Sequence, residues 1–466
     1  MTTTSAPMSP VLTAARRWAI LVICASSLFL VGLDTTIVNV ALPRIGHGLA
    51  AGTRALEWVV DAYTIVFASL LITSGALADR FGRRRIFQLG LVGFGLASVA
   101  CAAAPSVGAL IAARAVQGVA ASMLSPVALA IVVNATPDPR ERARAIGVWA
   151  SVFGLSMAAG PVAGGALLAG FGWRSVFWIN VPLVAAAVVL VAKVVPESRG
   201  GHARRLDPVG QVLLAGLLAL VVGLLIEAPA LGWTSPIILG GYAGVAAMSL
   251  AFAWVELRRP APLIDPRLFR RPPFAAAVLG AVAVFVALSV TVLFTTFYLQ
   301  EGRGWTPLAA GTAVLPLAVG ATVCAPLSGI LTGRLGPRVP LVLAGVFIAA
   351  GGGVLWAALT LSTITAVLLA AYLLLGIGVG FANAPITNTA VSGLPPERAG
   401  VAGGITSTAR QVGSAVGIAI AGGLVAGARS EAFTRAIYPG WLVAACGLSL
   451  LVVAAASHPR DASPSS

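Results

Sequence analysis

The sequence is poor in charge. Only 10% of its 466 residues are Asp, Glu, Lys or Arg, where about 25% is usual in a soluble chain. Its hydrophobic share is 58%, against about 45–50% in soluble proteins. Such a chain has too little polar surface to dissolve as a globular domain and is too apolar to stay disordered. We expect it to be embedded in a lipid bilayer.

The sequence also lacks the residues on which several kinds of chemistry depend. Its single lysine, Lys193, follows no glycine-rich loop, so a phosphate-binding loop for ATP is absent. The 3 histidines fall in expected loops or the tail, and the 4 cysteines lie alone in separate apolar segments. This spacing offers neither a metal-ligand set nor a disulfide framework. We therefore expect no metal, no cofactor and no enzymatic activity.

What the sequence does contain is a series of long apolar runs. A helix needs about 20 apolar residues to cross the bilayer core. The expected spans are residues 18–41, 57–78, 86–104, 107–134, 145–170, 175–195, 209–228, 236–256, 276–298, 309–332, 339–359, 364–392, 403–427 and 438–456. The fold class is thus an all-α membrane protein with fourteen transmembrane helices.

The basic residues indicate how these helices are oriented. Most Lys and Arg fall in the alternate loops that share a side with the N-terminus, and basic loops stay in the cytoplasm. The chain is therefore expected in the cell (inner) membrane, with both termini in the cytoplasm. The net charge of +15 is then a topology signal and does not indicate nucleic-acid binding. One cluster could also hold anionic headgroups of membrane lipid: Arg258, Arg259, Arg267, Arg270 and Arg271.

The chain contains an internal repeat. Segment 75–84 resembles segment 329–338, and the residues from Glu141 to Gly147 resemble those from Glu397 to Gly403. Both pairs have nearly the same offset, which indicates a duplication in the same membrane orientation. The expected division is a tail (1–17), a six-helix half (18–195), a linker region with two extra helices (196–275), a second six-helix half (276–456) and a tail (457–466). Parallel halves of this kind enclose a binding site and rock around it, as in transporters.

Three charged residues lie well inside the expected spans of the first half, away from the ends of those spans. Asp34 and Asp61 fall at similar depth on the first two spans, and Arg114 falls in the fourth. Charges inside a bilayer usually pair or line a water-filled cavity. One arginine against two aspartates leaves one negative charge unmatched. Asp34 is then expected to take up and release a proton; alternatively, Asp34 and Arg114 form a structural ion pair while Asp61 sits in the wet interface beside Trp58.

Several segments together resemble one known family. They are residues 33–43, the loop segment 75–84, Leu110 to Gly118, Gly154 to Gly165, and residues 173–182. In these segments the chain is similar to the fourteen-span drug:proton antiporters (the DHA2 family) of the major facilitator superfamily. The resemblance covers nearly the whole chain. It implies export of amphiphilic drugs or antibiotics in exchange for protons, by a chain expected to act as a monomer.

The resemblance also implies roles for two motifs of that family. The conformational residues are Gly75, Asp79, Arg80, Gly82, Arg83, Gly160, Pro161, Gly164 and Gly165. Asp79 and Arg83 would latch the halves in the outward-facing state, and Gly82 would permit a tight turn between them. Gly160 and Pro161 would form the antiport motif, or else a purely structural kink.

The substrate is less well defined. Candidate pocket residues are Gln117, Trp149, Phe153, Phe297, Tyr298, Phe381 and Asn383, although aromatic residues of this kind often serve only helix packing. The second half has few embedded acids and carries Arg410, Gln411 and Asn388 instead. Neutral or zwitterionic amphiphiles therefore fit as well as cations. The alternative is a proton-coupled exporter or importer of a metabolite such as an amino acid.

Overall fold

The computed structural model describes residues 13–136, 138–199, 206–260, 262–392, 396–426 and 440–457, with only some of the side chains in the first part of the two helices that start at residues 139 and 396. In these ranges the regular structure is entirely helical, which confirms the all-α prediction. The helices are α1 (Ala14–Leu49), α2 (Thr53–Phe81), α3 (Arg83–Ala103), α4 (Val107–Ser122), α5 (Ser125–Ala135), α6 (Pro139–Phe171), α7 (Ser175–Trp178), α8 (Asn180–Val194), α9 (Pro208–Leu231), α10 (Pro236–Arg258), the 3₁₀ turn η1 (Pro266–Arg270), α11 (Pro272–Phe297), the π-helical turn η2 (Tyr298–Gly302), α12 (Pro307–Ala313), α13 (Leu315–Leu335), α14 (Arg338–Ala358), α15 (Thr365–Val391), α16 (Pro396–Ala426) and α17 (Gly440–Ala456).

The described residues contain 12 segments long and apolar enough to cross a membrane. Two of the fourteen expected spans are not among them. The helix at 396–426 carries Arg410, Gln411 and several hydroxyl side chains, and only some of the side chains in its first part are described. The helix at Gly440–Ala456 is apolar but shorter than the other candidates.

Three expected spans are each split into two helices, and proline explains the breaks. Pro126, Pro182 and Pro316 lie at the second or third residue of α5, α8 and α13. Proline cannot donate a hydrogen bond to the carbonyl four residues earlier, so the preceding helix ends there. Proline alone does not decide the outcome. The first helix continues past Pro43 to Leu49, although the sequence predicts its end at residue 41.

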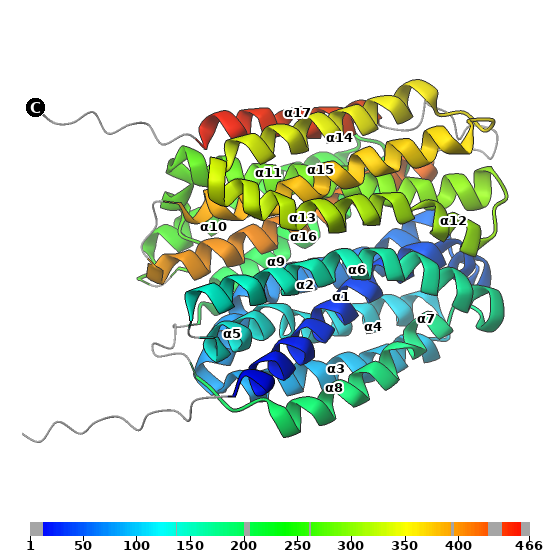
Figure 1. The fold of residues 1–466 in the computed structure, drawn as a ribbon. Helices are drawn as coiled ribbons and strands as arrows, with labels where there is room; N and C mark the ends of the chain where they lie inside the picture. The colour runs from blue at the N-terminus through cyan, green and yellow to red at the C-terminus, as the bar shows by residue number, and fades with distance from the viewer. Residues whose placement is uncertain are drawn as a thin grey trace, which may run out of the picture.

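The helices form two bundles (Figure 1). In the N-terminal bundle, α1 packs on α6, α2 on α4, and α3 on α4 and α8. In the C-terminal bundle, α13 packs on α15, α11 on α16, and α14 on α15 and α17. The helices α9 and α10 form a separate pair, of which α9 lies against α2 and α16.

The first residue of α1 and the last residue of α17 lie on the same side of the molecule (Figure 1). We call this the tail side; it also holds the turn at Gly82 between α2 and α3. The opposite side, which holds the α1–α2 connection at Gly52, is called the far side. Several close approaches between the bundles lie toward the far side. There the amide of Gln300 donates to the carbonyl of Val40 at 3.0 Å, and Gly311 packs against the carbonyl of Pro161.

Candidate functional site

A buried network of polar side chains surrounds Asp34 in the N-terminal bundle. Arg114 Nη1 lies 2.6 Å from Asp34 Oδ2, and both side chains have 0% exposure. The other carboxylate oxygen accepts hydrogen bonds from Gln117 Nε2 at 3.0 Å and Asn180 Nδ2 at 2.9 Å. Ser98 completes the network by accepting from both amides. Polar groups from α3, α4 and α8 thus surround the carboxylate of α1 with one charge-assisted hydrogen bond and two amide hydrogen bonds.

Arg114 is held from several directions. Its Nε donates to the carbonyl of Val59 at 3.1 Å, and its guanidinium lies 4.2 Å from the ring centre of Tyr63. Gly118 lets α4 approach α2 closely, because a Cβ there would lie 2.6 Å from the carbonyl oxygen of Tyr63. The predicted ion pair between Arg114 and an aspartate is present, and its partner is Asp34.

Asp61 lies in a different environment. Its side chain has 0% exposure, and in the described part of the chain neither carboxylate oxygen has a hydrogen-bond partner. No described arginine or lysine forms an ion pair with it. Asp61 is therefore not at the surface beside Trp58, whose indole N–H instead donates to Glu227 at 3.3 Å. A buried carboxylate with no partner is stable only when it is protonated.

Sequence reasoning missed a third carboxylate. Glu57 is placed at the first residue of an expected span, but α2 begins at Thr53, so Glu57 lies one turn inside the helix. It is 2% exposed, and its Oε2 has no hydrogen-bond partner in the described residues. Asn180 and Ser98 were also missed. A buried asparagine among apolar residues gives no signal until the fold shows what it faces.

The glycines of α6 fit against neighbours in both bundles. A Cβ on Gly164 would lie 2.9 Å from Ile37 of α1, and Gly160 packs on Thr36. On the C-terminal bundle, a Cβ on Gly165 would lie 2.5 Å from Leu308 Cα, and Pro161 meets Gly311. The motif thus lies at the contact between α6 and α12, and α6 itself runs unbroken through Pro161.

The loop motif forms a tight turn on the tail side. Gly82 alone separates α2 from α3, with φ at +113°, a conformation that favours glycine. Arg83 binds Asp79 through Nε at 2.9 Å and Nη2 at 2.8 Å, and its Nη1 donates to the carbonyl of Ala130. These contacts stay within the N-terminal bundle. Arg80 stacks beside Phe81, and no side chain fills the space at Gly75.

The candidate pocket residues whose side chains the structure describes do not lie together. Gln117 belongs to the Asp34 network, while Trp149 and Phe153 are outside the described side chains. Phe297 is buried at the far end of α11, and the hydroxyl of Tyr298 donates to the carbonyl of Thr360 at 2.5 Å. On α15, Phe381 is 8% exposed and Asn383 donates weakly to Val379.

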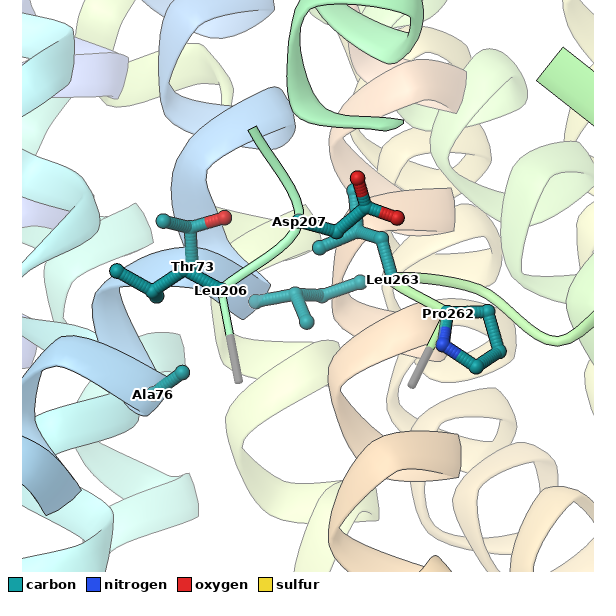
Figure 2. Close-up of a pocket in the computed structure, with 7 residues that line it drawn as sticks. Thr73, Ala76, Leu206, Asp207, Pro262 and Leu263 are labelled. Atoms are coloured by element: carbon teal, nitrogen blue, oxygen red, sulfur yellow. The ribbon is translucent and has the colours of Figure 1, made fainter. Parts of the chain in front are cut away.

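A pocket on the tail side lies between α2 and the two linkers of the extra helix pair (Figure 2). It is lined by Ile72, Thr73, Ala76, Leu206, Asp207, Pro262 and Leu263. Asp207 caps α9 by accepting from the amide of Gly210 at 2.9 Å, and Gln211 binds Thr73. The contact between Gln211 and Thr73 ties α9 to α2, and none of these residues belongs to the Asp34 network.

Comparison with known proteins decides the family. Residues 24–418 match the sequence profile of the Major Facilitator Superfamily. The chain belongs to this superfamily. It is therefore a multi-pass membrane protein of a transporter family rather than an enzyme.

Several curated proteins are similar over most of this chain. Multidrug resistance protein Stp of Mycobacterium tuberculosis is 39% identical over 399 residues, covering 86% of this chain and 74% of that protein. The tetracenomycin C resistance and export protein of Streptomyces glaucescens is 37% identical over 421 residues, covering 90% and 78%. The puromycin resistance protein pur8 of Streptomyces alboniger is 38% identical over 412 residues, covering 87% and 81%.

Proposed function

We propose that this chain is a proton-coupled drug exporter, which moves amphiphilic small molecules out across the plasma membrane. The observation that carries the proposal is the division of the buried acids. Asp34 is paired with Arg114, whereas Asp61 has neither a counter-charge nor a hydrogen-bond partner in the described chain. A carboxylate that is buried neutral in one state and exposed in another takes up and releases a proton as the transporter cycles.

In this proposal Asp61 carries the proton in the state that is closed on the far side. Asp34 and Arg114 complete the coupling site, because their ion pair joins α1 to α4 and Arg114 also donates to the carbonyl of Val59 on α2, the helix that carries Asp61. Each proton that moves inward yields about 2.3 kcal/mol per 100 mV of membrane potential. This energy supports export of a small molecule against its gradient.

We assign the chain to the fourteen-span drug:proton antiporters. In this assignment α16 and α17 cross the membrane as well as the 12 candidate segments. The residue ranges 18–195 and 276–456 are the two rocking halves, and 196–275 is the linker region with α9 and α10. The tail side carries Arg83, Arg84 and Arg338, so it faces the cytoplasm and both termini are inside. We expect the chain to act as a monomer, with membrane lipid around it.

Relatives named for multidrug resistance, for tetracenomycin C resistance and export, and for puromycin resistance support a drug or antibiotic as the substrate. A drug-susceptibility panel in an efflux-deficient host tests this. The wild-type gene should raise resistance to amphiphilic compounds of several classes, and Asp61→Asn should abolish that resistance at equal expression. If resistance is unchanged across the panel with the wild-type gene, the alternative of a metabolite transporter is favoured.

A further inference from the structure

Glu57 lies in the seam between the two bundles on the far side. The carboxyl group of Glu57 occupies the space that a side chain at position 422 of α16 would fill. Because residue 422 is a glycine, α2 and α16 can pack closely around this carboxyl group. Leu42 of α1 and Leu293 and Phe297 of α11 line the same hollow. The carboxyl group is therefore enclosed by apolar side chains from both bundles.

The charged groups that face Glu57 do not neutralise it. On α2 they are Asp61, one turn further along the helix, and Arg54; on α9 the facing group is Glu227. Arg54 Nη1 lies 2.9 Å from Glu227 Oε2, so its charge is already shared with another acid. The described residues that line Glu57 from α1, α11 and α16 are apolar. A negative charge on Glu57 would be buried among other acids without a partner of its own.

We infer that Glu57 is a proton-binding gate residue, which must be protonated before α2 and α16 can close on the far side. This inference rests on the proposed function and adds a residue to it. When the seam opens, Glu57 meets far-side water and loses its proton to it; when the seam closes, a proton from that water forms the O–H bond of the carboxylic acid. Protonation removes the charge that would otherwise be buried.

The proton on Glu57 returns to the side from which it came. Glu57 Oε2 and both oxygens of Asp61 have no hydrogen-bond partner in the described residues, so no described side chain links the two carboxyl groups by hydrogen bonds in the closed state. Glu57 therefore sets how closing depends on far-side pH, while Asp61 carries the transported proton. An acidic far side favours closing, which returns the empty transporter to the cytoplasmic side.

The test measures far-side closing directly. Cysteines at Ala103 and Ser362, which are exposed on the far side of the two bundles, are spin-labelled after the native cysteines are replaced by alanine. Their separation gives the ratio of closed to open molecules by double electron–electron resonance at a series of pH values. Each proton bound on closing lowers this ratio by up to tenfold for every unit rise in pH. In wild type, the pH dependence of this ratio should approach that of two protons bound on closing. In both Glu57→Gln and Asp61→Asn it should approach that of one proton.

Asp138→Asn is the control, because Asp138 is an exposed carboxylate on the tail side, away from the seam that holds Glu57. It should keep the wild-type pH dependence. If Glu57→Gln is poorly folded, Glu57→Met provides a second neutral side chain of similar length. The inference is overturned if the Glu57 variants keep the wild-type pH dependence, or if closing in wild type does not depend on pH. This measurement needs neither drug nor gradient, so its failure is distinct from failure of drug export in the susceptibility panel.

Discussion

Arg114 and Asp34 form a fully buried ion pair with 2.6 Å between Nη1 and Oδ2. This pair uses the positive charge that the sequence places in the outer part of the fourth span, and among the described residues it leaves Asp61 without a counter-charge. In the function proposed above, the two aspartates on neighbouring helices have different tasks: Asp34 holds helices together and Asp61 binds a proton.

Arg114→Gln should lower the free energy of unfolding by about 3–5 kcal/mol, because it leaves Asp34 buried without its partner. The double variant Asp34→Asn with Arg114→Gln should recover much of that loss, since no buried charge remains. Unfolding in mixed detergent micelles measures both. Arg174→Gln, at an exposed arginine on the ring of Trp173, is the control and should change little. A double variant as unstable as the sum of the two single variants contradicts this account.

Replacing Gly311 by valine should block closure of α6 against α12, because the new side chain would overlap the carbonyl of Pro161. We expect drug export to fall at least tenfold while the protein still reaches the membrane. Gly170→Val is the control on α6, since nothing lies within 4 Å of a Cβ at that position. Uptake of a fluorescent drug into inverted vesicles compares the two. Equal export by both variants would show that this contact does not matter for the cycle.

Arg410 offers a prediction on substrate class. Its Nη2 donates to the hydroxyl of Thr387 at 2.6 Å, and no described acid forms an ion pair with it. We expect this guanidinium to attract an acidic group of the substrate. Arg410→Gln should then reduce export of acidic compounds at least tenfold more than export of neutral ones, and Arg410→Lys should reduce it less. A uniform loss for all compounds would assign Arg410 a structural role.

The sequence predicts much of this architecture because the bilayer imposes strong constraints. Apolar length identifies the spans, and the cost of burying charge is enough to single out Asp34, Asp61 and Arg114 by their positions within those spans. The breaks at Pro126, Pro182 and Pro316 are harder to predict, because Pro43 and Pro161 lie inside helices that continue. The outcome depends on how tertiary packing satisfies the freed carbonyl.

Other parts of the site depend on three-dimensional neighbours. The sequence places Glu57 at the end of a span, where a charge is ordinary. Only the structure shows that α16 packs against it. Asn180 carries no charge, so the sequence gives no reason to expect its hydrogen bond to Asp34. The candidate pocket aromatics are predicted by residue type alone, and those that the structure describes lie at different ends of α11 and α15 rather than around one cavity.

The central claim is that Asp61 carries the coupling proton while Asp34 stays paired. Drug accumulation in inverted vesicles, driven by an imposed pH gradient, tests it most directly when it is measured beside drug–drug exchange without a gradient. The account predicts that Asp61→Asn loses gradient-driven accumulation but keeps exchange. Accumulation at the wild-type level in Asp61→Asn would contradict it.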